Sequence, residues 1–374
     1  MRGDHRPDPR TGLVRRPERR DRRHLRLADQ AARRLRGAAR VVKPRRPLRV
    51  TAASPIKHVV IIVKENHGYD NYFGTFPGGE GVGLPASPNP PHKDPDHRHG
   101  AWLKRDTSAP RVAFARHDIP HYWSYAQQYT VCDNYFTDVA GPSTPNHLML
   151  IMADSALIDN PKTNYRMSPG PPIYDQPSLP EKLDQAGLSW GNYNGYAFEY
   201  IRYTSGKMKT WQQFSVDAAA GKLPSVSWLY SDGLLSEHPA DTATQLAEGQ
   251  GDVSKGSLWT AGEVQAVVSA GLWPQAAIFI TWDDWGGWWD HVTPPEVEKW
   301  TDGTQFRYGG RVGCLVLSPY ARGGYVSKAL HSHVSLLKFC ERNFGLPPLN
   351  ARTTAADGME DCFDFEQKPL PPPQ

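Results

Sequence analysis

The chain has 374 residues, of which 39% are hydrophobic and 22% are charged, and its formal net charge is +4. A chain of this size can bury one large α/β core, so we expect a single catalytic domain. Of the 43 Lys and Arg residues, 18 fall in the first fifty positions, so the rest of the chain is acidic. We therefore expect no nucleic-acid partner. No apolar run approaches the roughly 18 residues of a membrane span, so no transmembrane segment is expected, and oligomeric state is left open.

The basic segment is predicted to be a disordered N-terminal extension over residues 1–54. Its paired arginines, such as Arg15-Arg16, are not followed by an uninterrupted apolar segment, so no signal peptide can be recognised. If the start is correct, the protein is expected to be cytoplasmic.

The elements expected in the body alternate between strand and helix. A β-branched run at 56–63 predicts a strand that is buried on both faces. A Gly-, Pro- and His-rich loop is expected next at 78–100, and a helix is expected to begin near Pro145. Further strands are predicted at 225–230, 276–281 and 311–318, and further helices at 122–129, 178–186, 260–270 and 332–343. The alternation predicts an α/β fold with a mostly parallel central sheet and helices on both faces, over residues 55–366. The Pro-rich tail at 367–374 is expected to fray.

Acidic and amide side chains follow two of the predicted strands. Glu65 and Asn66 come after the first strand, and Asp283 and Asp284 come after the strand at 276–281. Ligands of open α/β sheets bind beyond the carboxyl ends of the strands. An all-oxygen cluster there suits a hard or borderline divalent cation, although adjacent acids after a strand also serve as helix caps or solvated turns.

A serine in a turn is the third chemical element. Ser143 stands in a Gly-Pro-Ser-Thr-Pro-Asn turn that leads into an apolar run, so its hydroxyl is expected near the start of a helix. Backbone N–H groups at such a start favour a phosphate, which suits a serine nucleophile. A simple N-cap serine needs the same geometry, and the local sequence does not separate the two uses.

Several motifs together resemble one known family. ENHGYDNYFG resembles the signature ENRSFDHYFG of the bacterial phosphoesterase family, which includes phospholipases C and acid phosphatases, and TWDDWGGWWDHV resembles its TYDEHGGFYDHV. The matching motifs occur in the family's order, at 65–74, 132–136, 141–146, 237–239, 281–292 and 311–321. The chain departs from the pattern at His67-Gly68, at Asp284 where Glu is common, and at Ser143 where threonine is usual.

The resemblance implies an alkaline-phosphatase-like fold and a metal-dependent hydrolase of phosphoric esters. Ser143 would be phosphorylated during turnover and would also contact the metal, and His97, His238 and His291 would neutralise phosphoryl oxygens or protonate the leaving group. The metal ligands implied are Glu65, Asn66, Ser143, Asp283 and Asp284. The cation itself (Ca, Mg, Mn, Zn or Fe) is not identified. A small phosphomonoester or a phospholipid head group is the implied substrate, and export to the periplasm or medium is implied by the family.

Two other functions remain open. A sulfatase is one, because Ser143 to His147 approaches a sulfatase modification motif, with His147 in place of its arginine. A catalytically inactive protein that binds head groups or carbohydrate through Trp285, Trp288 and Trp289 is the other, although clustered tryptophans are more often pocket wall. The four cysteines are widely spaced without a CxxC pair, and either pair or remain buried free thiols.

Overall fold

The computed structural model describes residues 54–168, 170, 173–297 and 306–374, which lie in one compact unit of the chain. The extension expected over residues 1–54 lies outside the described residues, except for residue 54.

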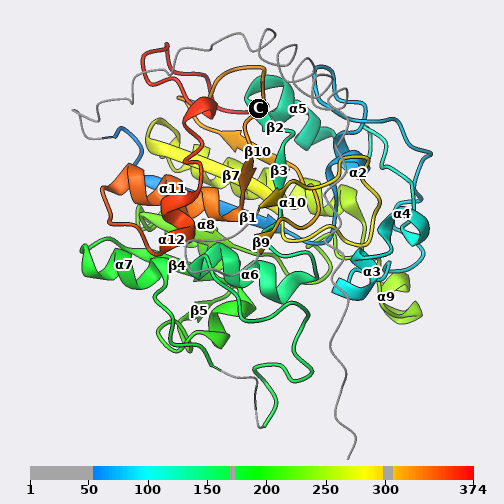
Figure 1. Cartoon of the computed structure of the whole chain (residues 1–374). Coiled ribbons are helices and arrows are strands. Elements are labelled where there is room, and N and C mark those ends of the chain that lie inside the picture. Colours follow the sequence, from blue (N-terminus) through cyan, green and yellow to red (C-terminus); the bar gives the residue numbers. More distant parts are fainter. Residues whose placement is uncertain (1–53, 169, 171–172, 298–305) are drawn as a thin grey trace, which may run out of the picture. The chain divides into compact units, whose positions relative to one another are not determined.

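A central sheet organises this unit (Figure 1). Its strands are β1 (His58–Lys64), β2 (Thr130–Cys132), β4 (Trp190–Tyr193), β5 (Met208–Lys209), β6 (Val226–Leu229), β7 (Ala276–Trp282), β10 (Cys314–Leu317) and β11 (Tyr325–Ser327). They are ordered β11-β2-β10-β7-β1-β6-β4-β5. Two small sheets pair β3 (Tyr135–Phe136) with β12 (His331–Ser332), and β8 (Glu296–Val297) with β9 (Phe306–Arg307).

The sheet is mostly parallel, as predicted. Strand β1 pairs in parallel with both β6 and β7, and its residues from Val59 to Val63 are at most 1% exposed. This burial on both faces explains the continuous β-branched sequence. The strand expected at 311–318 does not follow the pattern, because β10 runs antiparallel to both of its neighbours, β7 and β2.

Helices surround the sheet. Those described are α2 (Tyr69–Phe73), α3 (His99–Trp102), α4 (Arg105–Ser108), α5 (Pro120–Gln128), α6 (Ser143–Met152), α7 (Leu179–Gln185), α8 (Gln213–Ala219), α9 (Ala243–Ala247), α10 (Val253–Ser269), α11 (His333–Phe344) and α12 (Ala351–Ala355). Short 3₁₀ turns are η1 (Tyr196–Tyr200), η2 (Trp273–Gln275) and η3 (Glu360–Cys362).

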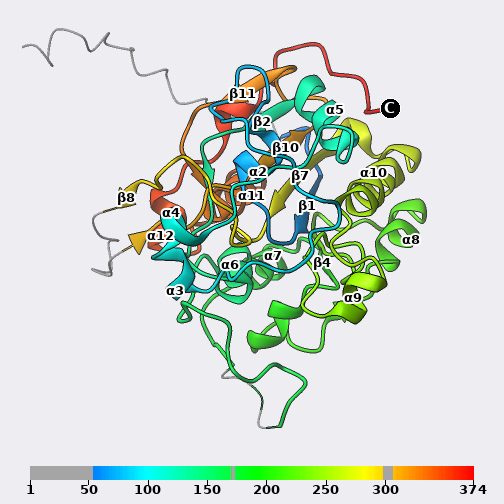
Figure 2. The ribbon, with the colours of Figure 1, turned by 90° about the vertical axis from the view of Figure 1, so that its right-hand side faces the viewer.

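Both faces of the sheet are covered, as Figure 2 shows from the side. Alternate residues of a strand point to opposite faces. On β7, Phe279 packs against Phe339 of α11 with ring centroids 5.0 Å apart, whereas Trp282 packs against Tyr122 of α5 at 5.2 Å. Helices α6, α7, α11 and α12 therefore lie on one face, and α5, α8 and α10 on the other. The predicted α/β layer structure is confirmed.

One of two helix starts agrees with the sequence-based expectation. Helix α6 begins at Ser143, with Pro145 in its first turn as expected. Helix α10 begins at Val253 rather than at residue 260, because the Asp252 side chain accepts hydrogen bonds from the backbone N–H groups of Ser254 and Lys255. The glycine within this first turn, Gly256, lies against the Glu237 side chain, where a Cβ atom would collide.

The Pro-rich tail, which was expected to fray, is hydrogen-bonded to the body of the protein. The Leu370 N–H donates to Pro319 O at 2.8 Å, and the Leu370 carbonyl accepts from Trp273 Nε1 at 3.1 Å. Tyr129 Oη donates to Pro371 O at 2.6 Å. Side chains of the domain thus supply donors for backbone carbonyls that belong to no strand.

Candidate active site

The two acidic strand ends meet at one edge of the sheet. The pairing of β1 with β7 places Lys64 opposite Trp282, so the residues that follow each strand emerge side by side. Asp283 N–H donates to Lys64 O at 2.9 Å, and Asn66 N–H donates to the Asp283 carboxylate at 2.8 Å. The expected convergence of these side chains therefore follows from strand register.

Ser143 lies at this edge. As the first residue of α6 it is 6% exposed, and its Oγ donates to Asp284 Oδ2 at 3.0 Å. The same Oγ is 3.4 Å from Asn66 Oδ1. The next backbone N–H, that of Thr144, donates to Asn160 Oδ1 at 2.8 Å, so it is already used inside the protein. The hydroxyl, rather than the N–H of Thr144, is the group that meets the acids.

A tight turn fixes the two strand ends against each other. Asn66 has a left-handed φ of 64°, and Gly286 has a φ of 61°. A Cβ atom at Gly286 would collide with the Asn66 carbonyl, so only glycine fits there. The Gly286 N–H donates to Asp284 Oδ1 at 2.7 Å, which orients the carboxylate whose other oxygen receives Ser143.

The pKa values of the two adjacent aspartates are shifted in opposite directions. Burial, reinforced by the negative charge of Asp283, raises the pKa of Asp284 to about 8. Although burial acts to raise the pKa of Asp283 also, its hydrogen bond with His147 holds that pKa below the usual range. Two neighbouring carboxylates with separated pKa values are typical of functional sites.

His147 is a site residue that the sequence analysis did not select. Its buried imidazole Nε2 is 3.1 Å from Asp283 Oδ2 and 3.5 Å from Glu65 Oε1, and the ring stacks on Tyr230 with centroids 5.2 Å apart. Burial alone would lower the pKa of His147, but the two carboxylates raise it to about 10. The signal in the sequence is its spacing: it stands four residues after Ser143, on the same face of α6.

His97 and His238 approach from two loops, with ring centroids 6.0 Å apart. His97 Nε2 is 3.3 Å from Asn66 Nδ2, and Nδ1 is 2.9 Å from Pro95 O. Burial opposes protonation of His97, but the charges of Asp284 and nearby Asp94 raise its pKa to about 9. The pKa of His238 is also raised, by Glu65 and Asp94 against the effect of burial.

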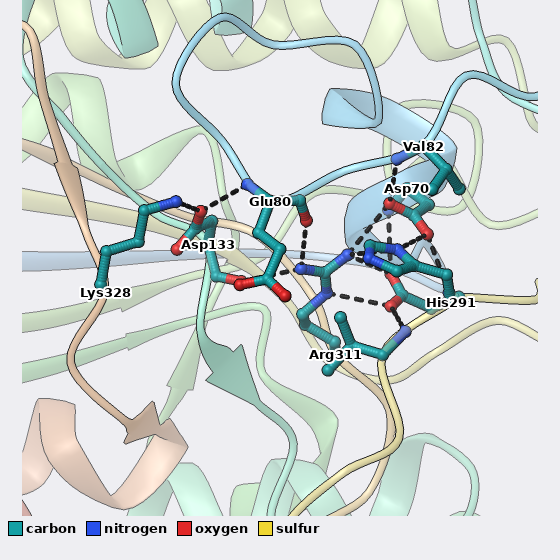
Figure 3. Close-up of polar contacts among 9 residues, drawn as sticks. Asp70, Glu80, Val82, Asp133, His291, Arg311 and Lys328 are labelled. Atoms are coloured by element: carbon teal, nitrogen blue, oxygen red, sulfur yellow. Dashed lines mark hydrogen bonds and ion pairs between the residues drawn. The ribbon is translucent and has the colours of Figure 1, made fainter. Parts of the chain in front are cut away.

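His291 lies in a different cluster (Figure 3). Its Nδ1 is 2.7 Å from Asp70 Oδ2, and Arg311 donates to Asp70 Oδ1 at 3.0 Å and to Asp290 Oδ1 at 3.0 Å. In the described part of the chain, no hydrogen bond or ion pair joins His291 directly to Ser143. Its role in catalysis stays a prediction, whereas His97 and His238 lie beside the acidic edge.

The Glu237-His238 motif reaches into the core. Glu237 is fully buried, lies 3.5 Å from Lys64 Nζ, and accepts hydrogen bonds from Tyr72 Oη at 2.7 Å and Trp282 Nε1 at 3.0 Å. Tyr122 Oη is also bonded to it. Glu237 is therefore a structural anion that anchors the loop carrying His238.

The tryptophan cluster forms a wall. Trp285 packs edge-on against Trp102 with centroids 5.1 Å apart, and its Nε1 donates to His97 O at 2.9 Å. Trp288 is 4% exposed, stacks on His67, and donates to Asn66 O at 3.0 Å. These buried rings hold the backbone beside site residues, which is a structural role.

Fold, site and relatives together define the class: the chain is a phosphoric ester hydrolase. Its sheet presents acids, imidazoles and a helix-start serine at one edge. The profile of the Phosphoesterase family matches residues 56–99 and 93–347, and the chain belongs to this family. The alkaline-phosphatase-like form of the fold, which the resemblance implies, stays a prediction.

Curated relatives agree in name. Phospholipase C B of Mycobacterium tuberculosis is 26% identical over an alignment that covers 84% of this chain and 79% of the relative. The non-hemolytic phospholipase C of Pseudomonas aeruginosa is 25% identical, with 83% of this chain and 57% of the relative covered. Among solved structures, murine ectonucleotide pyrophosphatase/phosphodiesterase 5 has a TM-score of 0.48 at 10% identity, with 82% of this chain and 100% of that chain covered.

Proposed function

We propose that the protein is a metal-dependent hydrolase that cleaves phosphoric esters through a phosphoseryl intermediate at Ser143. The observation that carries this proposal is the 3.0 Å hydrogen bond from Ser143 Oγ to Asp284, at an edge where two strands also deliver Glu65, Asn66 and Asp283. Ser143 does not act as a simple helix cap, because its side chain caps no backbone N–H of α6 and instead donates to a buried carboxylate.

The residues at this edge fit a divalent cation. Asp283 and Asp284 are adjacent and fully buried, so their mutual repulsion is an unfavourable feature that a cation would relieve. The carboxylates of Glu65 and Asp283 lie within one group of possible ligand atoms, and Ser143 bonds to both Asn66 and Asp284. We assign Glu65, Asn66, Ser143, Asp283 and Asp284 as ligands of one cation among Ca, Mg, Mn, Zn and Fe. When bound, it supplies Lewis-acid stabilisation of negative charge.

Ser143 performs the first displacement. Its Oγ forms a bond to phosphorus as the bond from phosphorus to the leaving alkoxide breaks, and its proton passes to Asp284. His97, whose pKa is raised to about 9, is charged near neutral pH and can donate the proton that the alkoxide needs, and His238, whose pKa is also raised, is the second candidate donor. In the second step water forms a bond to phosphorus as the bond from phosphorus to Ser143 Oγ breaks, and phosphate or a phosphomonoester leaves. The histidine that lost its proton takes one from the water, and Asp284 returns its proton to the serine.

A small phosphomonoester or a phospholipid head group is the proposed substrate. The support comes from relatives named phospholipase C and from the acidic body, which does not favour polyanions such as nucleic acid. Among the described residues, no helix has the length and apolar character needed to cross a membrane.

The proposal is tested by replacing the hydroxyl. Ser143→Ala should lower kcat by well over tenfold, which corresponds to more than about 1.4 kcal/mol of barrier. Ser143→Thr should keep part of the activity, and Ser215→Ala, at a half-buried position of α8, should keep all of it. Acid quenching during turnover of ³²P-labelled substrate should leave label on the peptide that spans 141–147.

A set of substrates and added metals completes the test. Dialysis against EDTA should abolish turnover of p-nitrophenyl phosphate, phosphatidylcholine or phosphatidylinositol, and one of the five cations should restore it. Label on another peptide, or an alanine variant with more than a tenth of wild-type kcat, would show that Ser143 is not the nucleophile. Full activity after metal removal would end the metal assignment.

A further inference from the structure

A second group of possible metal ligands lies away from the catalytic edge. Cys132 ends strand β2, His331 begins β12, and Cys362 ends the turn η3 near the C-terminus. The two sulfur atoms and an imidazole nitrogen lie within 4.8 Å of one another, and each residue is at most 1% exposed. Nothing in the proposed hydrolysis uses these three side chains.

We propose that Cys132, His331 and Cys362 bind a structural zinc ion, with Asp361 as the fourth ligand. The donor set is two thiols, an imidazole and a carboxylate, and such sulfur-rich sets select zinc over the hard cations. Full burial of three of the four residues is typical of a closed structural site rather than of a catalytic one with an open position.

Four of the six distances between the four donor atoms match the edges of a tetrahedron. Zinc bonds of about 2.3 Å to sulfur and about 2.0–2.1 Å to nitrogen and oxygen imply edges of about 3.8 Å between sulfurs, 3.6 Å from sulfur to nitrogen or oxygen, and 3.3 Å from nitrogen to oxygen. The Sγ atoms of Cys132 and Cys362 are 3.7 Å apart. Cys362 Sγ is 3.9 Å from His331 Nε2 and 3.6 Å from Asp361 Oδ1, and the last two atoms are 3.2 Å apart.

The side chains around the cluster are those that a zinc site needs. A ligating histidine usually directs its other ring nitrogen to a carboxylate. His331 Nδ1 lies 2.9 Å from Asp357 Oδ1, although the angle is outside that of a hydrogen bond. The second oxygen of Asp361 accepts from Ser327 Oγ at 2.5 Å and from Tyr325 Oη at 3.3 Å, which leaves Oδ1 toward the cluster.

The ion would cross-link distant parts of the sequence. Strand β2 lies between β10 and β11 in the sheet, and η3 belongs to the last twenty residues of the chain. A bond from each to one ion holds the C-terminal segment against this side of the sheet. We therefore expect zinc to stabilise the fold without taking part in turnover.

Cobalt substitution provides the test, because the catalytic edge has no thiol and cannot produce a thiolate-to-cobalt charge-transfer band. The full-length chain, purified with reductant and loaded with Co²⁺, should show this near-ultraviolet band, and Zn²⁺ should displace it and raise Tm. The band should disappear in Cys132→Ser and Cys362→Ser. It should persist in Cys340→Ser, whose thiol is equally buried but lies on α11 outside the cluster.

Asp361→Asn provides a variant outside the core, since this side chain is 29% exposed, and its band should shift or weaken. The wild-type spectrum decides the proposal even if a cysteine variant does not fold. A wild type without the band, or a band of equal strength in Cys362→Ser, would overturn it. A peptide map that finds Cys132 and Cys362 joined as the native disulfide in protein purified without reductant would also overturn it.

Discussion

Replacing Glu237 with glutamine should be among the most destabilising single changes in the described part of the protein. The carboxylate and Lys64 Nζ are both fully buried and 3.5 Å apart, and Tyr72, Tyr122 and Trp282 donate to the same carboxylate. Glutamine removes the negative charge and turns an NH₂ group toward donors. Loss of one partner from a buried ion pair costs about 3–5 kcal/mol, because the other charge is left in the core.

An exposed ion pair with a shorter distance between its charged atoms provides a matched control for the effect of burial. Arg202 and Asp175 are only 2.5 Å apart, but both side chains are 67% exposed. Asp175→Asn should therefore lower the free energy of unfolding by less than about 1 kcal/mol. Urea unfolding followed by tryptophan fluorescence, with equal m values, would compare the two variants.

The lysine makes the effect depend on pH. Burial already lowers the pKa of Lys64 even though Glu237 acts to raise it, and loss of Glu237 should lower it further. A base with a depressed pKa in the folded state destabilises the fold less as pH rises, so the loss in Glu237→Gln should be smaller at pH 10 than at pH 7. The double variant with Lys64→Met should recover part of the loss. A loss equal to that of Asp175→Asn would refute this reasoning.

Two further predictions concern stability and pH. Burial raises the pKa of Glu263 on α10 to about 7, so its stabilising contribution is present below about 4.5 and lost as pH rises to 7. Glu263→Gln should therefore raise the free energy of unfolding by about 2–3 kcal/mol at pH 8 and leave it unchanged at pH 4. Glu248→Gln, at an exposed position, should leave it unchanged at both pH values. In metal-free protein the raised pKa of His147 should make Tm fall as pH increases from about 6.5 to 10. His147→Gln should remove this dependence of Tm on pH. If the variant keeps the same dependence, the imidazole is not charged between Glu65 and Asp283.

Local sequence was sufficient where one short-range signal decided the structure. The β-branched run predicted β1 because burial on both faces requires apolar residues in continuous sequence, and the acids after β1 and β7 were correctly expected at a common edge. The start of α10 at Val253 was missed because Gly256 in its first turn argues against a helix. The glycine is required there because the Glu237 side chain packs against it, which local sequence does not reveal.

Long-range contacts were beyond that reasoning. His147 could have been found by its helical spacing from Ser143, but its two carboxylate partners come from separate strands. The sequence placed His291 beside Asp290 without revealing that Asp70 and Arg311 would surround it. The cysteines gave no spacing signal, because Cys132 and Cys362 are 230 positions apart and meet only after the chain between them has folded.

Because β10 runs antiparallel to β7, the residues before β10, rather than those after it, lie at the carboxyl end of β7. In register, Cys314 lies opposite Thr281 and Leu317 lies opposite Ile278, so this antiparallel strand starts at the end where β7 finishes. Arg311, which precedes the strand, therefore meets Asp70 and Asp290 beyond the carboxyl end of β7. Ser318 follows the strand and bonds instead to Ala276 O, at the opposite end of β7. Substitutions just before β10 thus change the ion-pair cluster of Asp70, Asp290 and Arg311, whereas those just after it change contacts at the other end of the sheet.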